Sequence, residues 1–188
     1  MNRIKLGLGV SLLSLLTTGC WIFTTFPLDG TNGMQGEYGG LIKRVLKGRE
    51  TTFLGGGTAS QQHDTEEERD LVIIIEDNDE GGAVVFGLEC DLPVSVQGPQ
   101  ELKLGGDVTC TRRTRDEVTQ TGGTIVQTEL VQTYTFSDLT VTKTGQPREI
   151  TLEASGNYLE VTFSNGSKVR EYNADFEYSY EGTRISAE

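Results

Sequence analysis

The sequence has only one histidine, His63, among its 188 residues. It has no G-x-S-x-G motif, and we find no catalytic triad of nucleophile, base and orienting acid. The glycine run at residues 55–57 lacks the lysine of a phosphate-binding loop, and no helix is expected after it. A carboxylate pair acting on glycosides stays open, because a sequence does not show the separation of two carboxylates. The sequence therefore predicts a non-enzymatic protein without a cofactor.

Basic residues are scarce, since 16 Lys or Arg stand against 28 Asp or Glu and the formal charge is −12. Binding of nucleic-acid phosphates needs a positive face, so a nucleic-acid partner is not expected. The one basic cluster is Arg112, Arg113 and Arg115. On a strand, Arg113 and Arg115 would share one face and Arg112 would lie on the other. We expect them to pair with acidic residues of a neighbouring strand, with an anion site as the alternative.

Candidate metal ligands are few, and no C-x-x-C spacing occurs. The stretch DNDEG at residues 77–81 resembles the start of a calcium loop, but positions five and twelve are Gly81 and Leu88. A hairpin turn is expected there, with a weak divalent-cation site as the alternative. The acidic run at residues 66–68 is expected to be a solvated charge run, and His63 a solvated loop residue. No metal site is therefore predicted.

No apolar run approaches the roughly 20 residues that a transmembrane helix needs. The uncharged run at residues 6–16 directly follows Arg3 and Lys5. This order and length are typical of a secretory signal peptide, which predicts export from the cytosol.

The apolar run ends in Leu16, Thr17, Thr18, Gly19 and Cys20, which resembles the lipobox of bacterial lipoproteins. In that family a small residue precedes a cysteine whose thiol is alkylated with diacylglycerol. The signal peptide is then cut before the cysteine, and the new amine is acylated. The resemblance implies that Cys20 is the lipid-modified first residue of the mature protein. Thr17 departs from the leucine that is usual at its position.

A lipid on Cys20 predicts a permanent attachment to a membrane, because several acyl chains bind far more firmly than one. Residue 21 is Trp rather than the Asp of the inner-membrane retention signal in enteric bacteria, so the outer membrane is expected. Residues 1–19 then form the signal peptide, residues 20–35 a lipid-anchored tether and residues 36–188 an antiparallel β domain. The domain faces either the periplasm or the cell surface.

Cys90 and Cys110 are the two cysteines that remain. Because the cell envelope is oxidising, a disulfide between them is expected, with free thiols as the main alternative. In the chain-entropy model a loop of about 20 residues stabilises the fold by roughly 3 kcal/mol.

Strand patterns recur after residue 36. In the first half we expect a strand at residues 37–46, a mobile polar loop at 48–69 and a strand buried on both faces at 70–76. The second half alternates apolar and polar residues around residues 139–142, 159–163 and 176–181, as in a sheet with one wet face. Turns are expected at Gly105-Gly106, Gly122-Gly123, Gly156-Asn157 and Asn165-Gly166, the last with the type I′ signature.

These patterns predict eight to ten strands in an all-β, antiparallel meander. Such a meander closes into an up-and-down barrel, or folds over as a β-sandwich, because an open sheet leaves adhesive edges. The body resembles small all-β bacterial lipoproteins with a lipocalin-like meander and a central cysteine pair. The residues that carry this resemblance are GEYGG at 36–40, DLVI at 70–73, Cys90, Cys110 and FEY at 176–178.

Two functions follow as expectations. The first is a lipid-anchored envelope protein whose β domain is a non-enzymatic interaction or structural module, with another envelope protein as its partner. The second is a barrel that holds a small apolar ligand in a lined interior cavity.

Overall fold

The computed structural model describes residues 33–78, 81–119, 124–146 and 148–185. The described chain is all β and contains no helix. Its nine strands are β1 (Gly36–Leu54), β2 (Gly57–Asp77), β3 (Ala83–Phe86), β4 (Leu92–Gly98), β5 (Glu101–Leu104), β6 (Val108–Thr119), β7 (Ile125–Lys143), β8 (Glu149–Ser164) and β9 (Ser167–Arg184). The predicted all-β fold is therefore confirmed.

The nine strands form one antiparallel sheet in the order β5-β4-β3-β2-β1-β9-β8-β7-β6. An additional pairing of β5 with β7 closes the hydrogen bonds into a ring, as the predicted meander requires. β6 lies outside this ring, because it pairs with β7 further along the same strand. β5 uses Thr140–Thr142 of β7, whereas β6 uses Ile125–Phe136.

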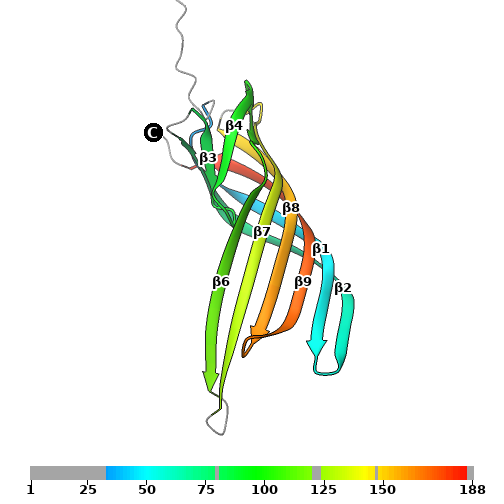
Figure 1. The fold of residues 1–188 in the computed structure, drawn as a ribbon. Coiled ribbons are helices and arrows are strands. Elements are labelled where there is room, and N and C mark those ends of the chain that lie inside the picture. The colour runs from blue at the N-terminus through cyan, green and yellow to red at the C-terminus, as the bar shows by residue number, and fades with distance from the viewer. Residues whose placement is uncertain (1–32, 79–80, 120–123, 147, 186–188) are drawn as a thin grey trace, which may run out of the picture.

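This arrangement divides the sheet into two parts along its strands (Figure 1). At one end β3, β4 and β5 complete the ring, and we call this end the closed part. At the other end the β1–β2, β8–β9 and β6–β7 hairpins extend beyond the short strands, and we call this end the open part. In the open part β2 and β6 are the two edges of a curved, six-stranded sheet.

The interior of the closed part is filled by side chains from all eight ring strands. Phe136, Phe176 and Tyr180 are the largest of these and are at most 2% exposed. Phe136 and Phe176 pack edge to face, with ring centroids 4.9 Å apart. The aliphatic remainder of this core is Ile42, Ile73, Ile75, Val85, Leu92, Leu102, Leu139, Val141, Ile150 and Leu152.

The end of the ring nearest the N-terminus is covered by Met34, which is fully buried. The hydroxyl of Tyr38 donates a hydrogen bond of 2.8 Å to the Met34 carbonyl. The hydroxyl of Tyr180 donates one of 2.6 Å to the carbonyl of Tyr38. The first described residues are therefore fixed to the closed part, at the opposite end from the hairpin tips.

The mobile loop predicted at residues 48–69 is wrong. Residues 48–54 continue β1 and residues 57–69 belong to β2, and the two strands pair from Gly36–Ile75 to Leu54–Gly57. The stretch is polar because it lies in the open part, where both faces of the sheet meet water. Polarity therefore indicated exposure and not the loss of strand structure.

Two other local predictions are corrected. Gly156-Asn157 is not a turn but lies within β8. A Cβ atom at position 156 would lie 2.0 Å from the Thr135 carbonyl oxygen, so glycine is required for close strand packing. The run at residues 70–76 is buried on one face only, because Ile73 and Ile75 are fully buried while Val72 is 44% exposed.

The turn predictions have mixed outcomes. Asn165 and Gly166 have φ values of 49° and 78°, which confirms the type I′ signal between β8 and β9. Gly105-Gly106 does separate β5 from β6, but the two strands follow each other along β7 and form no hairpin. The predicted turn at Gly122-Gly123 lies outside the described residues.

Candidate interaction site in the open part of the sheet

The inner face of the open part continues the core surface of the closed part, but its side chains are polar. Tyr134, Tyr158 and Tyr172 mark the transition between the two, and each is at most 6% exposed. Beyond them the strands present Gln132, Glu160, Arg170, Glu50, His63 and Arg112.

The three tyrosines form a connected layer across β7, β8 and β9. The ring centroids of Tyr134 and Tyr158 are 4.7 Å apart, and those of Tyr158 and Tyr172 are 6.0 Å apart. Burial raises the pKa of Tyr158, and its short hydrogen bond to Glu160 raises the pKa further. All three hydroxyls therefore stay protonated at neutral pH. The Tyr158 hydroxyl donates to Glu160, and the Tyr172 hydroxyl donates to the His63 carbonyl.

Charged and polar groups lie next to this layer in a network that spans four strands. Arg170 of β9 bonds Glu50 of β1 at 2.9 Å and Glu160 of β8 at 3.0 Å. Gln132 donates hydrogen bonds to Tyr158 and to Glu160. The bond from Arg170 lowers the pKa of Glu50, although burial opposes the shift. The network holds β1, β9, β8 and β7 together where no apolar core remains.

The boundary between the closed and open parts is the connection between β3 and β4. Cys90 in this connection is joined to Cys110 of β6 by a disulfide with a Cα–Cα distance of 5.9 Å. The predicted disulfide is therefore confirmed. On the opposite side, Glu89 bonds Arg69 of β2 at 3.3 Å and lies 3.9 Å from Arg44 of β1. The connection is thus tied to both edge strands of the open part.

Tyr178 has a buried hydroxyl near this boundary that makes no hydrogen bond of ordinary geometry in the described chain. Burial raises the pKa of Tyr178, and the nearby carboxylate of Glu89 raises it further. Arg44 acts in the opposite direction on the same hydroxyl. Because Arg44 also binds Glu67 at 2.6 Å, its guanidinium links the inner face to the β2 edge.

Beyond the β3–β4 connection, both edge strands of the open part have no neighbouring strand on their outer side among the described residues. β2 pairs with β3 only over Ile74–Asp77, and Gly87 and Glu89 of the connection lie beside Val72 and Arg69, so residues 57–68 have β1 on one side and no described strand on the other. β6 pairs with β7 alone. An unpaired edge presents main-chain N–H and C=O groups that can bind another strand. The open part therefore has the chemistry of a strand-binding surface.

The basic cluster on the β6 edge follows the predicted pattern. Arg113 and Arg115 lie on the outer face and share one carboxylate, that of Glu129 on β7, at 3.4 and 3.3 Å. Arg112 pairs with Gln132 in register and so lies on the inner face. Cross-strand pairing, and not an anion site, accounts for the two outer arginines.

The acidic run on the β2 edge and His63 differ from their predicted loop setting. Glu66 bonds Lys43 on the outer face at 2.6 Å, while Glu67 bonds Arg44 on the inner face. His63 packs edge to face against Tyr172, with centroids 5.4 Å apart. Its main-chain carbonyl accepts a hydrogen bond from the Tyr172 hydroxyl.

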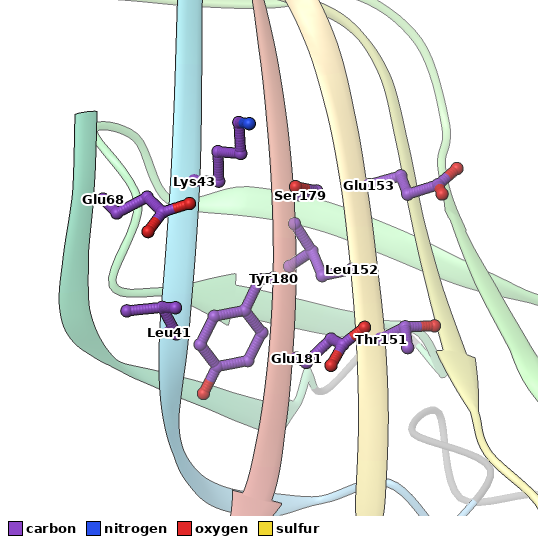
Figure 2. A pocket seen from close by; sticks show the side chains of 9 residues that line it. All are labelled: Leu41, Lys43, Glu68, Thr151, Leu152, Glu153, Ser179, Tyr180 and Glu181. Atoms are coloured by element: carbon purple, nitrogen blue, oxygen red, sulfur yellow. The ribbon is translucent and has the colours of Figure 1, made fainter. Parts of the chain in front are cut away.

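The outer face carries shallow, acidic grooves. Figure 2 shows one of about 320 Å³ over β1, β9 and β8, with Glu68, Glu153 and Glu181 around it. A second, of about 600 Å³, shares Lys43 and Glu153 with it and continues toward β7. Both grooves open to solvent and show no convergent set of catalytic groups. Within the described ranges, no group of three or more His, Cys, Asp or Glu side chains is placed to hold a metal ion.

Comparisons of the chain with protein-family models, with curated proteins and with solved structures found no match. The part of the chain that the structure describes has no helix with the length and apolarity to cross a membrane. Residues 1–32, including Cys20 and its lipobox-like sequence, lie outside the described residues.

Sequence reasoning missed the inner-face network as a site. One signal was present, since Tyr158 and Glu160 are two residues apart, as are Arg170 and Tyr172. This spacing places each pair on one face of a strand. The prediction of a loop at residues 48–69 left out the first part of β2 and the end of β1, and with them Glu50 and His63.

Proposed function

We propose that this protein is a lipid-anchored component of the bacterial cell envelope whose β domain is a non-enzymatic interaction module. The lipobox-like sequence at residues 16–20 supports the anchor. The open part of the sheet supports the interaction role, and this is the observation on which the proposal rests. A sheet with two unpaired edges and a polar, tyrosine-rich inner face is suited to binding another polypeptide.

The orientation of the open part relative to the point where the chain enters the domain is consistent with this role. Chain entry is at the closed part, since Met34 is buried there, while the hairpin tips lie at the other end (Figure 1). A strand of 19 residues such as β1 spans roughly 60 Å at about 3.3 Å per residue. A lipid on Cys20 would therefore hold the closed part near the membrane and direct the open part away from it.

The filled interior favours this proposal over the apolar-ligand barrel. The core side chains of the closed part are at most a few per cent exposed and make contact across the ring. The grooves in Figure 2 and beside it lie on the outer face and have acidic rims. A carrier of apolar molecules needs a lined cavity, whereas side chains fill the described core.

The anchor is tested with Cys20→Ser in cells that make the full-length protein. We expect an unprocessed precursor that is not acylated, detected by mass spectrometry, with the conservative variant Thr18→Ser processed as the wild type. An acylated, normally processed product from Cys20→Ser would contradict the anchor.

The interaction role is tested by a photoreactive amino acid at Leu130, on the inner face of the open part. Irradiation of intact cells is expected to give protein adducts at Leu130, with none at Glu153 on the outer face. Adducts of equal yield at both positions, or none at either, would contradict a binding role for the open part.

A further inference from the structure

We infer that the partner of the open part is a second copy of the same chain, whose β6 edge pairs with the β2 edge. This inference rests on the proposed interaction role and names its partner. The two unpaired edges carry clusters of opposite charge. The β2 edge has Asp64, Glu66, Glu67 and Glu68, whereas the β6 edge has Arg112, Arg113 and Arg115.

The directions of the two strands allow this pairing. Five antiparallel pairings separate β2 from β6 in the sheet order, so the two strands run in opposite directions. Two copies that stand side by side in the same orientation therefore bring β2 of one against β6 of the next as an antiparallel pair. Lipid anchors in one membrane would hold copies in that common orientation.

One register matches both charge and face along β6 beyond Cys110. With Glu67 opposite Arg112, inner-face residues oppose inner-face residues throughout, because alternation is conserved across paired strands. The cross-copy pairs are then Glu67–Arg112, Glu66–Arg113, Asp64–Arg115 and His63–Asp116. No like charges oppose each other in this register.

The same register follows from the tilt of the strands. The printed pairings connect His63 across the sheet to Gly48, Ala174, Tyr158, Tyr134 and finally Cys110. Strands of a closed sheet are inclined to the axis of the ring by about 35–45°, so residues paired across the sheet differ in height along that axis. Over five strand spacings of about 4.8 Å, the residue at the same height as His63 is displaced along β6 by about six positions. Six residues beyond Cys110 is Asp116, the residue that the charge match places opposite His63.

The arginines and carboxylates of both edges are available for such contacts. Arg113 and Arg115 share a single carboxylate and have side chains 64% and 75% exposed. Glu66 and Glu67 are 60% and 47% exposed and each binds one cation. Arg112 forms no ion pair with the described residues. The β6 edge therefore keeps unneutralised positive charge and the β2 edge keeps carboxylate oxygens to receive it.

The pairing is tested with two differently tagged, full-length chains made in the same cells, one carrying Thr65→Cys and the other Thr114→Cys. These inner-face positions oppose each other in the proposed register, and neither chain can form the new bond within itself. After mild oxidation, a disulfide-linked heterodimer is expected on a non-reducing gel. Val118→Cys, on the same face but four residues further along, replaces Thr114→Cys as the control and is expected to give at least fivefold less product.

Charge reversal then tests whether the opposite charges of the β2 and β6 edges stabilise the pairing. Glu66→Arg with Glu67→Arg in the Thr65→Cys chain, or Arg112→Glu with Arg113→Glu in the Thr114→Cys chain, should each lower the heterodimer yield at least fivefold. Both reversals together should restore at least half of it. Equal yields from the matched and control cysteine pairs, unchanged yields after single reversal, or no recovery in the combination would overturn the inference. If the cysteine pairs fail while Leu130 still gives adducts to another protein, only this inference fails and the interaction role stands.

Discussion

The closed and open parts are built from the same strands but are held together differently. Along β8 the inner face changes from Ile150, Leu152 and Ala154 to Tyr158 and Glu160. In the closed part a continuous apolar core stabilises the sheet, whereas in the open part tyrosines, arginine and glutamate form a hydrogen-bonded layer. The point at which the inner face becomes polar is the point at which the ring opens.

This contrast explains why the open part can serve as a surface. A polar inner face does not need to be covered by more chain, so the strands can extend beyond the ring without exposing a large apolar patch. Tyrosine suits the boundary, because its ring packs on the core while its hydroxyl reaches the polar layer. The disulfide at the β3–β4 connection fixes the β6 edge at the same level.

The largest expected difference between the two parts is in the effect of removing a phenylalanine ring. Phe136 is fully buried in the closed part, so Phe136→Ala should lower the free energy of unfolding by about 3–5 kcal/mol. Phe163 is only half-buried on the open part of β8, so Phe163→Ala should cost about 1 kcal/mol or less. Urea unfolding measures both, and losses of similar size would show that the two parts share one core.

The disulfide is expected to have the next largest effect. Replacing Cys90 and Cys110 by Ser should lower the unfolding free energy by about 3 kcal/mol, because the closed loop spans 20 residues. Hydrogen exchange should rise mainly in β6, since that strand has only β7 beside it. A Tm that is the same under oxidising and reducing conditions would contradict a stabilising role for the bond.

The smallest effect is expected from the charged network, and it depends on pH. Arg170 lowers the pKa of Glu50 below its ordinary value of 4.5, so the pair stabilises the fold fully above that pH. This contribution is lost as the pH falls through the lower, folded-state pKa. Glu50→Gln should therefore cost about 0.5 kcal/mol at pH 7 and progressively less below pH 4.5, as measured by urea unfolding.

The control for this last comparison is Glu153→Gln in the closed part. Glu153 forms no ion pair with the described residues, so its replacement removes no such contribution. If Glu50→Gln and Glu153→Gln gave the same dependence on pH, the network around Arg170 would not stabilise the open part.

The strands with alternating patterns could be predicted from the sequence, and the stretches with uniform polarity could not. The turn at Asn165-Gly166 was readable because both residues tolerate positive φ. The first part of β2 was missed because residues 57–69 are largely exposed to water, so they carry no apolar alternation to indicate a strand. The turn predicted at Gly156 was wrong for a different reason. This glycine lacks a Cβ because β7 packs closely against it, and not because the chain turns there.

Residue type and local spacing specify the strand-rich composition, the lipobox-like sequence at residues 16–20 and the presence of Cys90 and Cys110. The tertiary structure alone decided where the ring closes, which edges stay unpaired and how Arg170 reaches Glu50, 120 residues away along the chain. Those features depend on the register between strands distant in sequence, and no local pattern specifies that register. The opposite charges of the β2 and β6 edges are visible in the sequence, but only the sheet order makes them the two borders of one surface.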